Sequence, residues 1–130
     1  TRYEHLSLYH YIDIALDPFH FNGHTTSMEA LWMGVPVVTM KGQTGFGRVT
    51  YSFLSILGLE ELVAYTQEEY IEKAVDLAKN ISKLRQLRQV MREALLNSPL
   101  CNQHDFMKAI EGFYRHVWQT WCEEQITLKL

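Results

Sequence analysis

The sequence predicts an α/β fold: a Rossmann-like parallel sheet with flanking helices, ending in long helices. In the first half of the chain, short apolar segments alternate with segments rich in helix-forming residues. From Gln67 the pattern changes to apolar residues spaced three and four apart, which is typical of amphipathic helices. With 130 residues, of which 47% are hydrophobic, the chain has material for one globular core, so we expect a single domain over residues 1–130.

The first elements form a strand, a helix and a second strand. Ile12 to Leu16 is short and mostly apolar, and Val35 to Met40 is rich in β-branched residues, so we expect two strands that are buried on both faces. Between them, Thr25 to Trp32 contains good helix formers, and Gly34 is a stop signal. Two consecutive strands joined through a helix pair in parallel.

The next two elements continue the alternation. Phe46 to Leu57 is expected to be a helix because Gly58 follows it as a terminator. Leu62 to Ala64 is expected to be a third short strand. The sheet therefore gains a strand before the helical half of the chain begins.

Three helices are predicted after Gln67. The first has an apolar face made of Tyr70, Ile71, Ala74, Val75, Ala78 and Ile81. The second carries Leu84, Leu87, Met91, Ala94 and Leu95 and ends before Pro99, and its basic group, Lys83, Arg85, Arg88 and Arg92, is expected to be a solvated face. The third runs from Gln103 to Trp121, with an aromatic stripe that we expect to pack in the core or between domains, and the tail 126–130 is expected to fray.

Composition excludes several classes of function. The formal net charge of -3 provides no basic excess for holding nucleic acid. The apolar stretches are shorter than a membrane span needs, and the start lacks a signal peptide, so no membrane partner is expected. Cys101 and Cys122 are far apart and lack the spacing of a disulfide framework or a metal site, which favours a cytoplasmic protein. Because the first residue is Thr1 and not Met, we expect an amino-terminal portion to be missing.

The most informative segment is the loop and helix start after the first strand. Asn22 and Gly23 lie in the loop, and His24, Thr25 and Thr26 open the helix. These five residues are the candidates for binding a phosphate group, because Gly23 also lets the backbone approach a ligand closely. The unpaired amide groups and the positive dipole end of such a helix favour a phosphate, to which the hydroxyl and imidazole groups would donate. The alternative is structural: a threonine caps the helix, and Asn22 with Gly23 only turns the chain.

Four further residues are candidates for ligand contacts. Glu29 lies one helical turn after the threonines, where its carboxylate would accept from ribose hydroxyls, although a surface acid would look the same. His5 could stack on a base if its segment reaches the same cleft. Lys41 and Arg48 bound a glycine-rich loop that could close over an anion but matches neither a Walker loop nor a dinucleotide fingerprint, and Arg48 is equally a candidate helix-start residue.

The chain resembles the catalytic region of the O-linked N-acetylglucosamine transferase and SPINDLY family. The resemblance rests on IDIALD, NGHTTSMEALWMGVPVVTM, a glycine-containing segment ending at Arg48 and Val49, GLEELVA, and the SPL before the last helix, which together cover nearly the whole chain in order. It implies the second lobe of a GT-B glycosyltransferase, in which two Rossmann-like lobes face each other and the second binds the nucleotide-sugar.

The resemblance also implies roles for individual residues. His24, Thr25 and Thr26 match the diphosphate-binding residues of the family, and Glu29 stands at an acidic ribose-binding position. His5 matches a residue that lies against the uracil ring. Leu8 stands where some members have an arginine, and the acid/base residues of the family lie upstream of Thr1, so no catalytic residue is assigned.

The implied activity is inverting transfer of N-acetylglucosamine from UDP-GlcNAc to serine or threonine hydroxyls of proteins. The family resemblance implies no metal or other cofactor, and protein acceptors would bind through tetratricopeptide repeats upstream. Two alternatives stay open: a GDP-fucose or UDP-glucose donor, or a non-catalytic nucleotide-binding or interaction module. For the chain alone, we expect weak UDP binding, no transfer activity, and self-association through the last helix.

Overall fold

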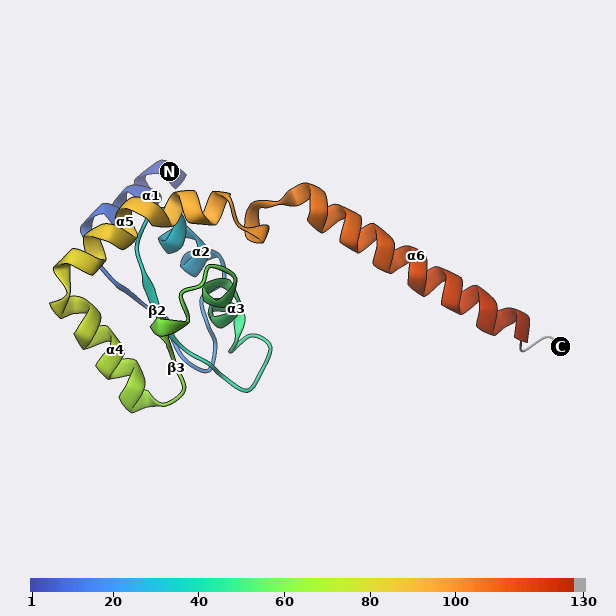
Figure 1. The fold of residues 1–130 in the computed structure, drawn as a ribbon, viewed down its shortest axis with the longest axis horizontal. Coiled ribbons are helices and arrows are strands. Elements are labelled where there is room, and N and C mark those ends of the chain that lie inside the picture. The colour runs from blue at the N-terminus through green and yellow to red at the C-terminus, as the bar shows by residue number, and fades with distance from the viewer. Residues whose placement is uncertain (128–130) are drawn as a thin grey trace.

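The structure, a computed structural model, describes residues 1–127 and shows an α/β domain from which one long helix projects (Figure 1). The parallel sheet has three strands in the order β1 (Ala15–Leu16), β2 (Val37–Met40) and β3 (Val63–Ala64). In its register, Ala15 lies opposite Val37, and Thr39 lies opposite Val63. The predicted parallel sheet is confirmed.

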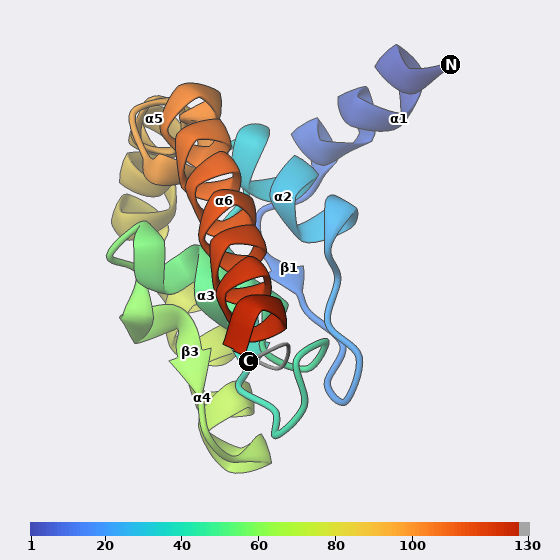
Figure 2. The ribbon, with the colours of Figure 1, turned by 90° about the vertical axis from the view of Figure 1, so that its right-hand side faces the viewer.

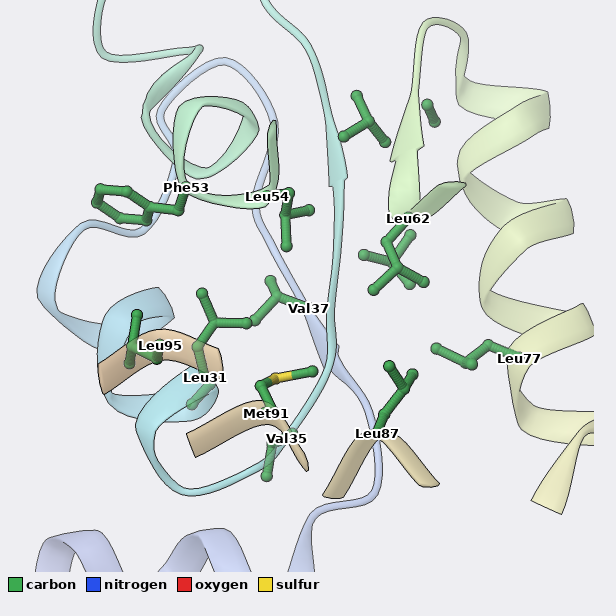
Figure 3. Close-up of a cluster of buried hydrophobic side chains, with 14 of the residues drawn as sticks. Leu31, Val35, Val37, Phe53, Leu54, Leu62, Leu77, Leu87, Met91 and Leu95 are labelled. Atoms are coloured by element: carbon green, nitrogen blue, oxygen red, sulfur yellow. The ribbon is translucent and has the colours of Figure 1, made fainter. Parts of the chain in front are cut away.

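Helices cover both faces of this sheet. The helices α2 (Thr25–Trp32) and α3 (Val49–Ile56) pack on one face of β2, and α4 (Gln67–Lys79) packs on the other (Figure 3). The helix α5 (Ile81–Leu96) contacts both α2 and α4 and closes the core at one end. The labelled core side chains in Figure 3 are Leu31, Val35, Val37, Phe53, Leu54, Leu62, Leu77, Leu87, Met91 and Leu95.

Local signals mark the ends of these helices, although α3 begins at Val49 and not at the predicted Phe46. The side chains of Thr66 and Asn80 accept the first-turn amide protons of α4 and α5. Gly34 ends the turn after α2 with φ of 78°, and a Cβ there would lie 2.8 Å from the Arg88 carbonyl oxygen. A larger residue at Gly34 would therefore strain the turn and displace α5.

The expectation that both predicted strands are buried on two faces is wrong for the first one. The central strand β2 is buried from Val37 to Thr39, whereas Leu16 of β1 is 59% exposed. Edge position alone does not cause this exposure, because β3 is also an edge strand and its Val63 and Ala64 are buried. An apolar pattern in the sequence does not show which other segments cover a strand.

The predicted apolar face of α4 is shifted from the observed one. Tyr70 and Leu77 are buried, whereas Ile71 and Val75 are 63% and 43% exposed. The Tyr70 hydroxyl donates a hydrogen bond of 3.0 Å to the Asp17 carbonyl oxygen, which fixes the rotation of the helix. Burial raises the pKa of Tyr70, and the nearby Asp17 carboxylate adds to this effect.

The structure contains an amino-terminal helix that the sequence did not predict. The helix α1 (Arg2–Ser7) is followed by a 3₁₀ turn, η1 (Leu8–Tyr11). Thr1 and Glu4 form a capping box at its start. Within residues 1–11, only Leu6, Ser7 and Tyr9 are even partly buried. A helix with so small a buried face has no clear apolar periodicity in its sequence.

Two arginines of the basic group on α5 are not simply solvated. The half-buried Arg88 guanidinium donates to the carbonyl oxygens of Tyr9 and Ile12, and so ties the first segment of the chain to α5. Arg92 lies 4.7 Å from the centre of the Trp32 ring. Only part of this group therefore forms the predicted solvated face, because guanidinium groups also bind carbonyls and aromatic rings.

The last helix leaves the body of the molecule. The elements η2 (Glu60–Leu62) and η3 (Pro99–Cys101) are short 3₁₀ turns, and after η3 the helix α6 (Gln103–Thr127) extends away (Figures 1 and 2). Its Trp118 and Trp121 rings stack with centres 5.2 Å apart, yet these side chains are 63% and 51% exposed. Within the described residues, the expectation that this stripe packs in the core is therefore wrong, and α6 exposes an apolar surface, as expected for a helix through which the chain would self-associate.

At the end of the chain, residues 126 and 127 remain helical, although the tail 126–130 was expected to fray; the rest of that tail lies outside the described residues. None of the helices within residues 1–127 combines the length and the apolar character that crossing a membrane requires.

Candidate functional site

The loop between β1 and α2 is organised by Asp17, a residue that the sequence analysis did not single out. Its buried carboxylate accepts hydrogen bonds from the Gly23 amide at 2.7 Å, the Thr39 hydroxyl at 2.6 Å and the Ser27 hydroxyl at 3.2 Å. The Thr50 hydroxyl completes the network by donating to the Gly23 carbonyl oxygen at 3.1 Å. One carboxylate thereby fixes the loop relative to β2, α2 and α3.

The start of α2 lacks a side-chain cap. His24 is the N-cap residue and makes no capping hydrogen bond, and Thr25 and Thr26 occupy the first helical positions. The alternative in which a threonine caps the helix is therefore wrong. Without a capping side chain, first-turn amide groups stay available to a ligand, and the helix dipole places partial positive charge at the same point.

A cavity of about 560 Å³ opens at this helix start. Its polar lining residues are Arg2, His24, Thr25 and Glu29, and its apolar lining residues are Leu6, Met28, Trp32, Phe53 and Leu100. The His24 ring stacks on Phe53 with centres 5.8 Å apart, which holds the imidazole at the mouth of the helix. A cavity lined by both polar and apolar side chains suits a ligand that joins an anion to an organic ring.

A hydrogen bond joins α1 to α2 beside the cavity. His5 Nε2 lies 3.0 Å from Glu29 Oε2, and the Glu29 side chain is only 18% exposed. The Tyr9 ring meets His5 edge to face, and its hydroxyl donates to the Thr26 carbonyl oxygen at 3.2 Å. Burial raises the pKa of Tyr9, and the Glu29 carboxylate adds to this effect, so the hydroxyl stays a donor at neutral pH.

The structure brings together some of the predicted site residues and not others. His24, Thr25 and Glu29 line the cavity, and His5 is bound to Glu29. Thr26 lines a separate, smaller hollow beside β1. Asn22 is buried behind the loop, where its Nδ2 donates to the Pro18 carbonyl oxygen at 3.2 Å and its Oδ1 has no hydrogen-bond partner among the described residues.

Gly23 allows the close approach of the helix start to the loop. A Cβ at this position would lie 2.4 Å from Ser27 Oγ and 2.7 Å from Thr26 Oγ1. Its amide already donates to Asp17. Its place in the structure therefore matches a role in shaping the loop.

The two cations of the glycine-rich loop lie away from the cavity. Lys41 Nζ sits 4.1 Å from the centre of the Tyr51 ring. Arg48 is the N-cap residue of α3, and its Nε donates to the Thr44 carbonyl oxygen at 3.3 Å. Neither residue is part of the cavity wall, so the helix-start interpretation of Arg48 agrees with its position.

Arg2 is a cavity residue that sequence analysis missed. It belongs to α1, which was not predicted, so nothing in the sequence indicated that Arg2 lines the same cavity as the start of α2. Glu4 at the third helical position, reciprocating the Thr1 cap, was the available signal for that helix. Among residues 1–127, no group of three or more histidine, cysteine, aspartate or glutamate side chains has the arrangement of a metal site.

Comparison with known proteins gives a consistent match. The family model described as glycosyl transferase family 41 matches residues 1–110. A protein of Hordeum vulgare is 41% identical over 93% of this chain, and one of Solanum lycopersicum is 41% identical over 95%; both are named "Probable UDP-N-acetylglucosamine--peptide N-acetylglucosaminyltransferase SPINDLY". An Arabidopsis thaliana protein with the same activity in its name, SEC, is 36% identical over 94% of the chain.

The structural comparison agrees with the sequence comparison. A mutant of the Thermobaculum terrenum O-GlcNAc transferase superposes with a TM-score of 0.85 and 44% identity, over 92% of this chain. The chain spans 13% of the length of each of these plant relatives and 23% of the solved transferase chain. Its fold is that of the second lobe of a GT-B glycosyltransferase.

Proposed function

This chain belongs to glycosyl transferase family 41, and we propose that it is the donor-binding part of an enzyme that glycosylates proteins. The donor is UDP-GlcNAc, and the acceptors are serine or threonine hydroxyls. The names of the plant relatives and of the solved transferase support this choice of donor and acceptor.

The observation that carries the proposal is the uncapped start of α2 at the cavity wall. The diphosphate binds there, to first-turn amides, the Thr25 hydroxyl and His24. The ribose hydroxyls donate to Glu29, and the base packs against His5. Arg2, which also lines the cavity, adds a positive charge beside the diphosphate.

The chemical role of this site follows from the charge that develops in the transfer. An acceptor hydroxyl attacks the anomeric carbon and gives its proton to a general base outside this chain, while the bond between that carbon and the phosphate oxygen breaks with inversion. The electron pair stays on the departing UDP. The helix dipole, Thr25, His24 and Arg2 stabilise this negative charge without a metal ion.

The first test measures UDP binding by the purified chain, using NMR chemical-shift changes during a titration with UDP. In the double variant Thr25→Val and Thr26→Val, side-chain donors are lost while shape is retained. We expect UDP to bind at least about tenfold more weakly, because hydrogen bonds to charged groups are stronger than neutral ones. Thr25 should account for most of the loss, since its side chain lines the cavity.

The matched control is Ser52→Ala, which removes an exposed hydroxyl from α3. This variant should leave the affinity for UDP unchanged. Removing metal ions with EDTA should also leave the affinity of the unchanged chain for UDP the same, because the proposed site contains no metal. Unchanged UDP affinity in the double threonine variant would place the phosphate elsewhere.

A competition experiment separates the donors. We expect UDP-GlcNAc to displace bound UDP more effectively than UDP-glucose or GDP-fucose. Transfer of radiolabelled N-acetylglucosamine to a serine-containing peptide, by a full-length protein that includes this chain, tests the activity. Donor binding without transfer in that protein would favour a non-catalytic nucleotide-binding module.

A further inference from the structure

Two exposed phenylalanine rings stack on each other beside the start of α2. Phe21 lies in the loop before α2, and Phe46 lies in the glycine-rich loop after β2. Their ring centres are 5.3 Å apart with an interplanar angle of 24°, yet the residues are 69% and 53% exposed. Neither ring belongs to the core, so the pair presents an aromatic surface to solvent.

Backbone hydrogen bonds hold this pair in place. The Asn22 amide, next to Phe21, donates to the Phe46 carbonyl oxygen at 3.1 Å and joins the two loops. The Gly42 amide donates to the Gly47 carbonyl oxygen at 2.7 Å and closes the second loop on itself. The Phe21 and Phe46 pair is therefore held by the same two loops that shape the start of α2. A ligand that binds to it would lose little free energy to ordering these loops.

The position of the pair relates it to the proposed donor site. The hydrogen bond between His5 and Glu29 lies where α1 meets α2, and Phe21 lies three residues before His24 in the chain. In Figure 2, α1 lies above α2, and the two loops lie side by side below it. A nucleotide-sugar consists of nucleoside, diphosphate and sugar in that order. With its nucleoside near α1 and its diphosphate at His24, its sugar extends towards the loops.

We propose that Phe21 and Phe46 form a binding platform for the sugar ring of the donor. This proposal rests on the proposed function, because it takes the diphosphate to lie at the start of α2. A pyranose ring has a face of C–H groups that packs on an aromatic surface, while its hydroxyl groups remain free to bond elsewhere. The platform orients the sugar ring, and with it the anomeric carbon, relative to the diphosphate.

The test compares UDP, which lacks the sugar, with UDP-GlcNAc. In the double variant Phe21→Ala and Phe46→Ala, we expect affinity for UDP-GlcNAc to fall roughly five- to tenfold, in keeping with the loss of one aromatic packing contact. Affinity for UDP should stay the same. In saturation-transfer NMR, the sugar protons should lose their enhancement in the variant, while the uridine protons keep theirs.

The matched control is Tyr11→Ala, which removes a similarly exposed ring from η1, at 87% exposure. It should change neither affinity. Thermal unfolding of each variant establishes that the fold is retained. The conservative change Phe46→Tyr, which keeps an aromatic face, should retain binding of UDP-GlcNAc.

The outcomes separate this proposal from the one on which it rests. If the unchanged chain does not bind UDP, the donor site itself is wrong. If it binds UDP, and the double phenylalanine variant loses UDP and UDP-GlcNAc equally or loses neither, the platform is refuted while the diphosphate site stands. If the double phenylalanine variant still bound UDP-GlcNAc normally but no longer bound an acceptor peptide, the pair would be a peptide-binding surface, and the sugar platform would likewise be refuted.

Discussion

Asp17 is the residue on which the geometry of the candidate site depends most. It is 2% exposed, and its two carboxylate oxygens accept from Gly23, Ser27 and Thr39. These three donors belong to the loop, to α2 and to β2, which are the parts that set the position of His24. A carboxylate at the end of β1 therefore acts on the phosphate site through the backbone, without touching a ligand.

Replacing this carboxylate should therefore cost both stability and binding. We expect Asp17→Ala to lower the free energy of unfolding by about 3 kcal/mol, because buried donors lose an ionised acceptor. Asp17→Asn should lower it less, since the amide oxygen still accepts. Urea unfolding measures both values. The exposed Asp13→Ala is the control and should change stability by no more than about 0.5 kcal/mol; an equally small effect at Asp17 would contradict the role assigned to it.

At the scale of elements, the docking of α1 on the body depends on α5. Arg88 bonds the carbonyl oxygens of Tyr9 and Ile12, and so holds the segment that carries His5 and Arg2 against α2. In addition to these bonds from Arg88, His5 contacts α2 through its hydrogen bond with Glu29. Arg88, which does not line the cavity itself, thereby helps to position the segment that carries Arg2 and Leu6 of the cavity lining.

The variant Arg88→Met tests this arrangement, because it keeps the length of the side chain and removes its donors. We expect amide hydrogen exchange in α1 to become about tenfold faster, while exchange in β2 stays slow. Arg85→Met, an exposed position on the same helix, is the control. Equal protection of α1 in the two variants would show that its docking does not depend on Arg88.

At the scale of the whole molecule, α6 is the feature that most affects behaviour in solution. The helix projects from the domain and exposes apolar side chains along much of its length (Figure 1). The large exposed ones are Phe106, Met107, Phe113, Tyr114, Val117, Trp118 and Trp121. Exposed apolar surface of this extent favours association with another surface.

We therefore predict that the purified chain self-associates in a concentration-dependent way. The double variant Trp118→Glu and Trp121→Glu should weaken association about tenfold or more, because it removes two stacked indole rings and adds like charges. Gln119→Glu adds one charge to the same exposed helix without removing a ring, and should have a smaller effect. Sedimentation velocity over a range of concentrations measures the change. A chain that stays monomeric at every concentration would contradict the prediction.

The part of the candidate site that is formed by residues close in sequence could be predicted, as could the local elements of the fold. The start of α2 follows from a strand, a loop containing glycine and a run of helix formers, all of which are close in sequence. The cavity that it faces is built from α1, α3 and η3 as well. Arg2, Phe53 and Leu100 had no local pattern that linked them to His24, so only their packing assigns them to one site.

By itself, the sequence determined the parallel α/β unit, the bounds of α2 and the terminating turn at Gly34, because these depend on local conformational preferences and on hydrophobic patterning. The tertiary structure alone decided that β1 is an edge strand, which face of α4 is buried, and that α6 leaves the core. Each of these depends on contacts between distant segments, such as the bond from Tyr70 to Asp17 across 53 residues. Local periodicity permits several such contacts, and only the packing of the complete set selects one.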